Sequence, residues 1–138
     1  MRSSELRIGN LVKVDSNPFE SVTQIFKDGV VTDAYDVVNS FKDLEPIPLT
    51  EEWLVKFGFE KSIDGFEMSK DITIRNNNGW VKEMVFFQID DGLCGVSLRD
   101  IYDCGEKETY VIEIDIEYVH QLQNLFWCLT GKELTIKE

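Results

Sequence analysis

The sequence predicts an α+β fold, in which a small SH3-like β module precedes an antiparallel β-meander covered by a C-terminal amphipathic helix. Three observations predict it: helical periodicity near the C-terminus, hairpin-turn dipeptides at regular intervals, and a pair of prolines that separates the two parts. The β module is expected at residues 1–45, and the meander with helices at 50–57 and 116–130 is expected at residues 46–138. A chain of 138 residues suits one compact unit.

Short strand signals fill the first 45 residues. Residues 5–14 predict a strand with a turn or bulge at Gly9-Asn10, and residues 21–26 alternate with the period of a strand. Asp28-Gly29 is a two-residue hairpin signal, and residues 35–38 predict a further strand. Several short strands in so few residues are typical of a small SH3-like barrel, a shape that hosts many unrelated functions.

Pro46 and Pro48 mark the joint between the two parts, because proline excludes helix and holds the preceding residue extended. A short helix is predicted directly after them. Thr50 is its expected N-cap, and two glutamates in the first turn suit the helix dipole. Gly58 is expected to end this helix in the left-handed conformation.

Hairpin signals then follow at Asp64-Gly65, Asn78-Gly79 and Asp91-Gly92. The segments between them are strand-like: residues 66–68 with 72–74, 80–89, 93–98 and 110–114. Alternation along residues 112–116 leaves one face of the sheet apolar, and the C-terminal helix is expected to cover it. Leu134 and Ile136 predict an added edge strand.

The C-terminal helix has two distinct faces. Asp115 is its expected N-cap and Gly131 its expected left-handed end. Its apolar stripe consists of Tyr118, Val119, Leu122, Leu125, Phe126 and Leu129. The opposite face is a candidate interface, formed by His120, Gln123, Asn124 and Trp127. Three alternatives stay open for it. It can pack inside the molecule, against the N-terminal module for example, or bind a partner or second copy, since Trp is enriched at interfaces. The least favoured alternative is a catalytic role for His120.

The net charge of −12 is concentrated in residues 83–117, which hold ten acidic residues against two basic ones. Such a field disfavours direct binding to nucleic acid or to an anionic membrane and permits a basic protein partner. A simpler explanation is that these acidic side chains lie on solvent-exposed faces of strands and keep the protein soluble. The alternative functional hypothesis is an acidic mimic of DNA that inhibits a nucleic-acid-binding protein. The candidate acidic face consists of Asp90, Asp91, Asp100, Asp103, Glu106 and Glu108.

Residues typical of catalytic and metal sites are sparse. Cys94, Cys104 and Cys128 stand at unmatched spacings, which predicts free thiols in a reducing cytoplasm. The sequence contains one histidine and lacks Cys-x-x-Cys pairs and phosphate-binding glycine loops. No lysine follows an acidic residue by two positions, as a common class of magnesium nucleases requires. We therefore expect no metal and no cofactor.

An enzyme would have to use carboxylates alone. Asp90, Asp100 and Asp103 are the first candidates, and they would have to converge in a pocket that raises a pKa. The leading hypothesis is instead a non-enzymatic protein-interaction module.

Three strings in the chain resemble a known family: ELRIGNLV at 5–12, LEPIPLTEEWLVKFGFEK at 44–61 and YVHQLQNLFWCLTGKELTI at 118–136. In this order they resemble a family of small uncharacterised proteins from prophage and mobile-element regions of gut Bacteroidetes. The resemblance covers both ends and the joint. It implies a cytoplasmic bacterial setting and an accessory, phage-related role, and it carries no catalytic residues to transfer.

Overall fold

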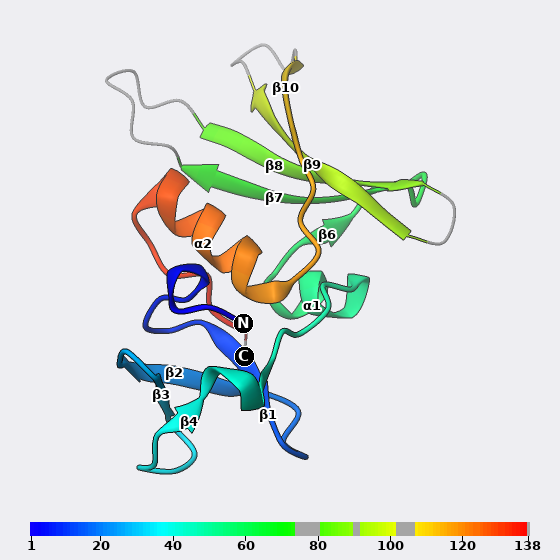
Figure 1. Ribbon diagram of the computed structural model, residues 1–138. Coiled ribbons are helices and arrows are strands. Elements are labelled where there is room, and N and C mark those ends of the chain that lie inside the picture. Colours follow the sequence, from blue (N-terminus) through cyan, green and yellow to red (C-terminus); the bar gives the residue numbers. More distant parts are fainter. Residues whose placement is uncertain (74–80, 90–91, 102–106, 138) are drawn as a thin grey trace. The chain divides into compact units, whose positions relative to one another are not determined.

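The fold is α+β, with two antiparallel sheets and a C-terminal helix (Figure 1). The computed structural model describes residues 1–73, 81–89, 92–101 and 107–137. The chain divides into two compact units. The first contains Met1–Leu49 and Glu117–Cys128, and the second contains Thr50–Ile116 and Leu129–Glu138.

The first unit contains a five-stranded sheet with the strand order β4-β3-β2-β1-β5, antiparallel throughout. Short 3₁₀ turns, η1 (Ser3–Glu5) and η2 (Phe41–Asp43), precede β1 and β5. The strands are β1 (Leu11–Val14), β2 (Glu20–Ile25), β3 (Gly29–Thr32), β4 (Asn39–Ser40) and β5 (Leu44–Glu45). One side of the sheet packs a small apolar core of Leu6, Val12, Val14, Val22, Val30 and Leu44.

Three strand predictions in this unit are wrong in detail. The strand expected at residues 5–14 begins only at Leu11, as β1. The β2–β3 hairpin turns at Lys27-Asp28, because the Phe26 amide donates to the Gly29 carbonyl (2.8 Å) and Gly29 belongs to β3. A Cβ at Gly29 would lie 2.1 Å from the carbonyl oxygen of Asn39, so this glycine permits the close approach of β4. The strand expected at residues 35–38 lies instead at Asn39–Ser40, and residues 35–38 are exposed.

Helix α2 (Val119–Thr130) starts later than residue 116. Asp115 is not its N-cap. The side-chain oxygen of Gln121 instead accepts hydrogen bonds from the amides of Glu117 (2.9 Å) and Tyr118 (3.0 Å), which would otherwise lack partners at the helix start. The predicted end is confirmed, since Gly131 has φ 68°.

The second unit begins with helix α1 (Glu51–Lys56), whose predicted ends are confirmed. The Thr50 hydroxyl accepts from the Trp53 amide (3.4 Å). At the other end, Gly58 has φ 83°, and the Phe59 amide donates to the Leu54 carbonyl (2.9 Å) as in a Schellman motif.

The second sheet has the order β10-β9-β8-β7-β6, so each strand pairs antiparallel with its neighbour in sequence. Its strands are β6 (Glu60–Lys61), β7 (Glu67–Thr73), β8 (Val81–Ile89), β9 (Gly92–Ile101) and β10 (Lys107–Ile114). Alternate positions on one face are buried and apolar: Met68, Ile72, Met84, Phe86, Val96 and Leu98.

The structure confirms only some of the turns and strands predicted for this unit. Asp64-Gly65 does lie in the β6–β7 hairpin, although the loop is longer than two residues because Ser62 and Glu67 pair at its base. Asn78-Gly79 lies outside the described residues, as does Asp91, while Gly92 begins β9. The predicted edge strand at Leu134 and Ile136 is absent, since residues 131–137 form no strand.

None of the helices in the described residues is long and apolar enough to cross a membrane.

Candidate functional site

The helix face predicted as a candidate interface is largely occupied by contacts within the first unit. The Gln123 side-chain oxygen accepts from the Leu11 amide (2.8 Å), and its nitrogen donates to the Gly9 carbonyl (3.1 Å). Asn124 donates to the Glu5 carbonyl (2.9 Å) and accepts from the Asn10 side chain (2.9 Å). The two amides thus bind the segment that joins η1 to β1, which runs beside α2 in Figure 1.

His120 and Trp127 differ in their exposure. His120 is buried and stacks on Tyr118 with ring centroids 5.9 Å apart. Burial lowers the pKa of His120 below its ordinary value of 6.5, and the negative charge of Glu5 opposes this shift. Trp127 is 42% exposed, and the Arg7 guanidinium carbon lies 4.3 Å from its ring centroid. Trp127 is therefore the most exposed of the four predicted interface residues.

The candidate acidic face falls mostly outside the described residues. Asp90, Asp91, Asp103 and Glu106 lie there, so the predicted convergence of carboxylates in an acid-only active site is not described. Asp100 in β9 and Glu108 in β10 occupy opposite register positions. The predicted free thiol is observed at Cys128, which is exposed.

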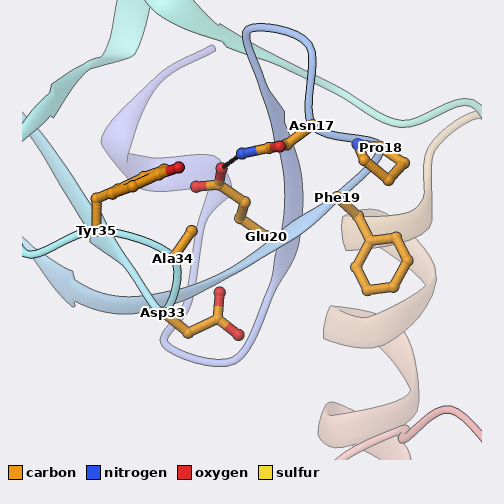
Figure 2. Close-up of a pocket in the computed structure, with 7 residues that line it drawn as sticks. All are labelled: Asn17, Pro18, Phe19, Glu20, Asp33, Ala34 and Tyr35. Carbon is orange, nitrogen blue, oxygen red and sulfur yellow. Dashed lines mark hydrogen bonds between the residues drawn. The ribbon is translucent and has the colours of Figure 1, made fainter.

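A hollow in the first unit was not predicted from the sequence. It has a volume of about 400 Å³ and is formed by two segments, residues 17–20 before and within β2 and residues 33–35 after β3 (Figure 2). Its walls combine aromatic rings and carboxylates. The lining residues are Asn17, Pro18, Phe19, Glu20, Asp33, Ala34 and Tyr35.

Glu20 is the most unusual side chain of this hollow, because it is a carboxylate only 4% exposed. One of its oxygens accepts from the Asn17 side-chain amide (2.5 Å) and the other from the Thr32 hydroxyl (2.5 Å). Both donors are neutral. Among the residues that the structure describes, no lysine or arginine forms an ion pair with Glu20. The hollow therefore contains a buried carboxylate that is hydrogen-bonded but not paired with a cation.

The two segments are held in place by backbone contacts. The Ser21 amide donates to the Asp33 carboxylate (2.8 Å), and the Asp33 amide donates to the Ser21 carbonyl (2.9 Å). Before β2, Asp15 has φ 51° and the Asn17 amide donates to the Val14 carbonyl (3.1 Å), which forms a tight turn. Residues 33–35 are therefore fixed alongside the start of β2.

Aromatic rings lie on both sides of the buried carboxylate. In Figure 2 the Tyr35 ring lies on one side of Glu20, and Pro18 and Phe19 lie on the other. Tyr35 is 65% exposed, so most of its ring is available to a ligand. A sequence signal for Glu20 did exist: in the period-two pattern of β2 it shares the buried face with Val22.

A second, more polar hollow of about 390 Å³ lies in the second unit and is lined by Gly58, Glu60, Ser69, Lys70, Asp71 and Glu83. Two of its charged groups, Lys70 and Glu83, have partners in the chain. The Lys70 ammonium donates to the Phe57 carbonyl (3.0 Å) at the end of α1. Glu83 pairs with Arg99 (3.4 Å), which also contacts Glu67 (3.0 Å). These contacts support the fold of the second unit.

Comparisons with protein-family models, with curated proteins and with solved structures gave no match for this chain.

Proposed function

We propose that the chain is a non-enzymatic protein-interaction module whose first unit binds a cationic stretch of another protein. The observation that supports this most directly is the hollow around Glu20, where a buried carboxylate with no cationic partner among the described residues lies beside an exposed tyrosine ring. Such a carboxylate is stabilised when a cation approaches it, because burial weakens its hydration.

The surroundings of the hollow suit the same class of partner. Residues 15–38 contain five acidic residues and one lysine, a net charge of −4. Exposed apolar side chains are interspersed with these acids: Phe19, Phe26, Tyr35, Val37 and Val38. A segment that combines basic and apolar side chains matches both features, and the acidic field would speed its association at low salt.

The proposal includes an SH3-like arrangement of the first sheet. Five antiparallel strands, a 3₁₀ turn between β4 and β5, and the return of β5 to pair with β1 all support it. This is an analogy of shape and adds no functional residue. An accessory role in a mobile element, which the family resemblance implies, is compatible with an adaptor of this kind.

The proposal can be tested by selecting short peptides from a random library on the immobilised full-length chain. We expect the selected peptides to be rich in lysine and arginine, and we expect their binding, measured by fluorescence anisotropy, to weaken as salt is raised.

Two matched variants locate the binding surface. Tyr35→Ala and Phe66→Ala each remove an aromatic side chain that is 65% exposed, the first from the first unit and the second from the second unit. Tyr35→Ala should weaken binding about tenfold and Phe66→Ala should leave it unchanged. Selected peptides without an excess of positive charge, or equal binding by Tyr35→Ala and the unchanged chain, would contradict the proposal.

A further inference from the structure

We infer that the hollow around Glu20 is an arginine site, which holds the guanidinium group of a partner's arginine between the Glu20 carboxylate and the Tyr35 ring. This inference rests on the proposed function and deepens it, because it names the side chain that the first unit recognises.

The hydrogen bonds within the described part of the chain use only part of the accepting capacity of the Glu20 carboxylate. A carboxylate offers about four acceptor positions on its two oxygens. Asn17 and Thr32 each use one of these positions, one on each oxygen. These two donors also fix the orientation of the carboxylate, so its remaining lone pairs have a defined direction. A charged ligand with several N–H donors is the complement of such a group.

The second carboxylate of the hollow, Asp33, is also held in place. One of its oxygens accepts from the Ser21 amide (2.8 Å). Asp33 lines the same hollow as Glu20, although its carboxylate lies apart from the Glu20 carboxylate in Figure 2. A ligand bound there experiences two negative charges, while the described residues that line the hollow include no positive charge. This charge balance selects a cation over a neutral or anionic group.

The aromatic wall favours arginine over lysine. A guanidinium is planar and weakly hydrated, and it stacks on aromatic faces while its N–H groups bind a carboxylate. The Tyr35 side chain extends toward the Glu20 carboxylate in Figure 2, so one flat cation placed beside the ring can reach both groups. An ammonium group is compact and strongly hydrated, and would use the ring less well.

The test is a titration of the full-length chain with blocked single amino acids, followed through backbone amide chemical shifts. The probes are N-acetyl-arginine methylamide, the lysine analogue, and the citrulline analogue, a neutral group of nearly the same shape as arginine. We expect arginine to give saturable amide shifts in residues 17, 19–20 and 33–35; Pro18 has no amide proton. Lysine should bind several-fold more weakly, and citrulline should give no saturable shift in these residues.

Matched variants separate the site from the general charge of the unit. Glu20→Gln should weaken arginine binding about ten- to hundredfold, because a charge-assisted hydrogen bond is lost. Asp28→Asn removes the same charge from the exposed β2–β3 turn and should leave binding nearly unchanged. Tyr35→Leu should weaken binding, whereas Phe26→Leu, at an exposed aromatic residue outside the hollow, should not.

If Glu20→Gln fails to fold, the comparison of arginine with citrulline on the unchanged chain and the Tyr35→Leu variant still decide the question. Equal shifts with arginine and citrulline, shifts centred outside residues 17–20 and 33–35, or equal losses in Glu20→Gln and Asp28→Asn would each overturn the inference. If one of those results occurs, but selected basic peptides still bind and Tyr35→Ala still weakens their binding, then the arginine site is wrong and the proposed function stands. Failure of the basic peptides as well would overturn both.

Discussion

Replacing Gln123 by alanine should destabilise the protein strongly, because this side chain binds α2 to the segment before β1. Gln123 is 2% exposed and hydrogen-bonds both the Leu11 amide (2.8 Å) and the Gly9 carbonyl (3.1 Å). The substitution leaves these two backbone groups without their side-chain partner. The Leu11 amide is buried, and leaving it unsatisfied costs about 1–3 kcal/mol, whereas the part-buried Gly9 carbonyl can accept from water instead. The lost packing adds about 1 kcal/mol.

The expected loss is therefore about 2–4 kcal/mol, which lowers Tm by roughly 6–12 °C in a chain of this size. Urea unfolding followed by tryptophan fluorescence and by circular dichroism measures the free energy of unfolding. Gln24→Ala is the matched control, since Gln24 is exposed in β2 and its loss should change stability by less than about 0.5 kcal/mol. A Gln123→Ala variant as stable as the Gln24→Ala variant would show that Gln123 does not hold α2 to the segment before β1.

Three further predictions follow from local geometry. Thr50→Ala should cost about 1 kcal/mol in urea unfolding through loss of the N-cap of α1, and Thr50→Ser should cost much less; equal losses would contradict the cap. Gly29→Ala should cost about 1–3 kcal/mol, because its Cβ would lie 2.1 Å from the Asn39 carbonyl oxygen, and unchanged stability would show that β4 moves freely. Burial lowers the pKa of His120 from 6.5, so the unfolded chain binds this proton more tightly. The stability contributed by neutral His120 is thus complete above about pH 6.5 and is lost as the pH falls through the lower folded pKa. His120→Gln should flatten unfolding curves measured across this window, and an unchanged pH dependence would contradict the assignment.

Signals that act within one turn of the chain could be predicted from the sequence. Thr50 and Gly58 cap α1 as expected, because each bonds to backbone groups only a few residues away. Gly131 ends α2 for the same reason. Their effects are local, and the rest of the fold does not alter them.

Features that depend on distant partners could not be predicted in this way. Asp28-Gly29 is a strong turn signal, yet Gly29 lies in β3 because the Asn39 carbonyl approaches it from another strand. Asp115 suits an N-cap, but the chain first forms a bridge between Pro48 and Tyr118, and the helix starts after it.

The candidate site also combines a local feature that could be predicted with features that depend on distant residues and could not. The alternation of β2 places Glu20 on the buried face, and this much is present in the sequence. The hollow itself requires residues 33–35 to lie beside residues 17–20, which depends on the hydrogen bonds between Ser21 and Asp33. On α2, the positions of Gln123 and Asn124 did not show whether their amides bind a partner or the chain's own backbone, because the backbone groups they contact are more than 100 residues away.

The arginine site is tested most directly by an isotope-filtered nuclear Overhauser spectrum of the chain bound to a selected arginine-containing peptide. If the hollow holds arginine, contacts should appear from the arginine side-chain protons to the Tyr35 ring and to the side chains of residues 17–20. Contacts confined to other parts of the chain, with the Tyr35 ring untouched, would contradict the arginine site.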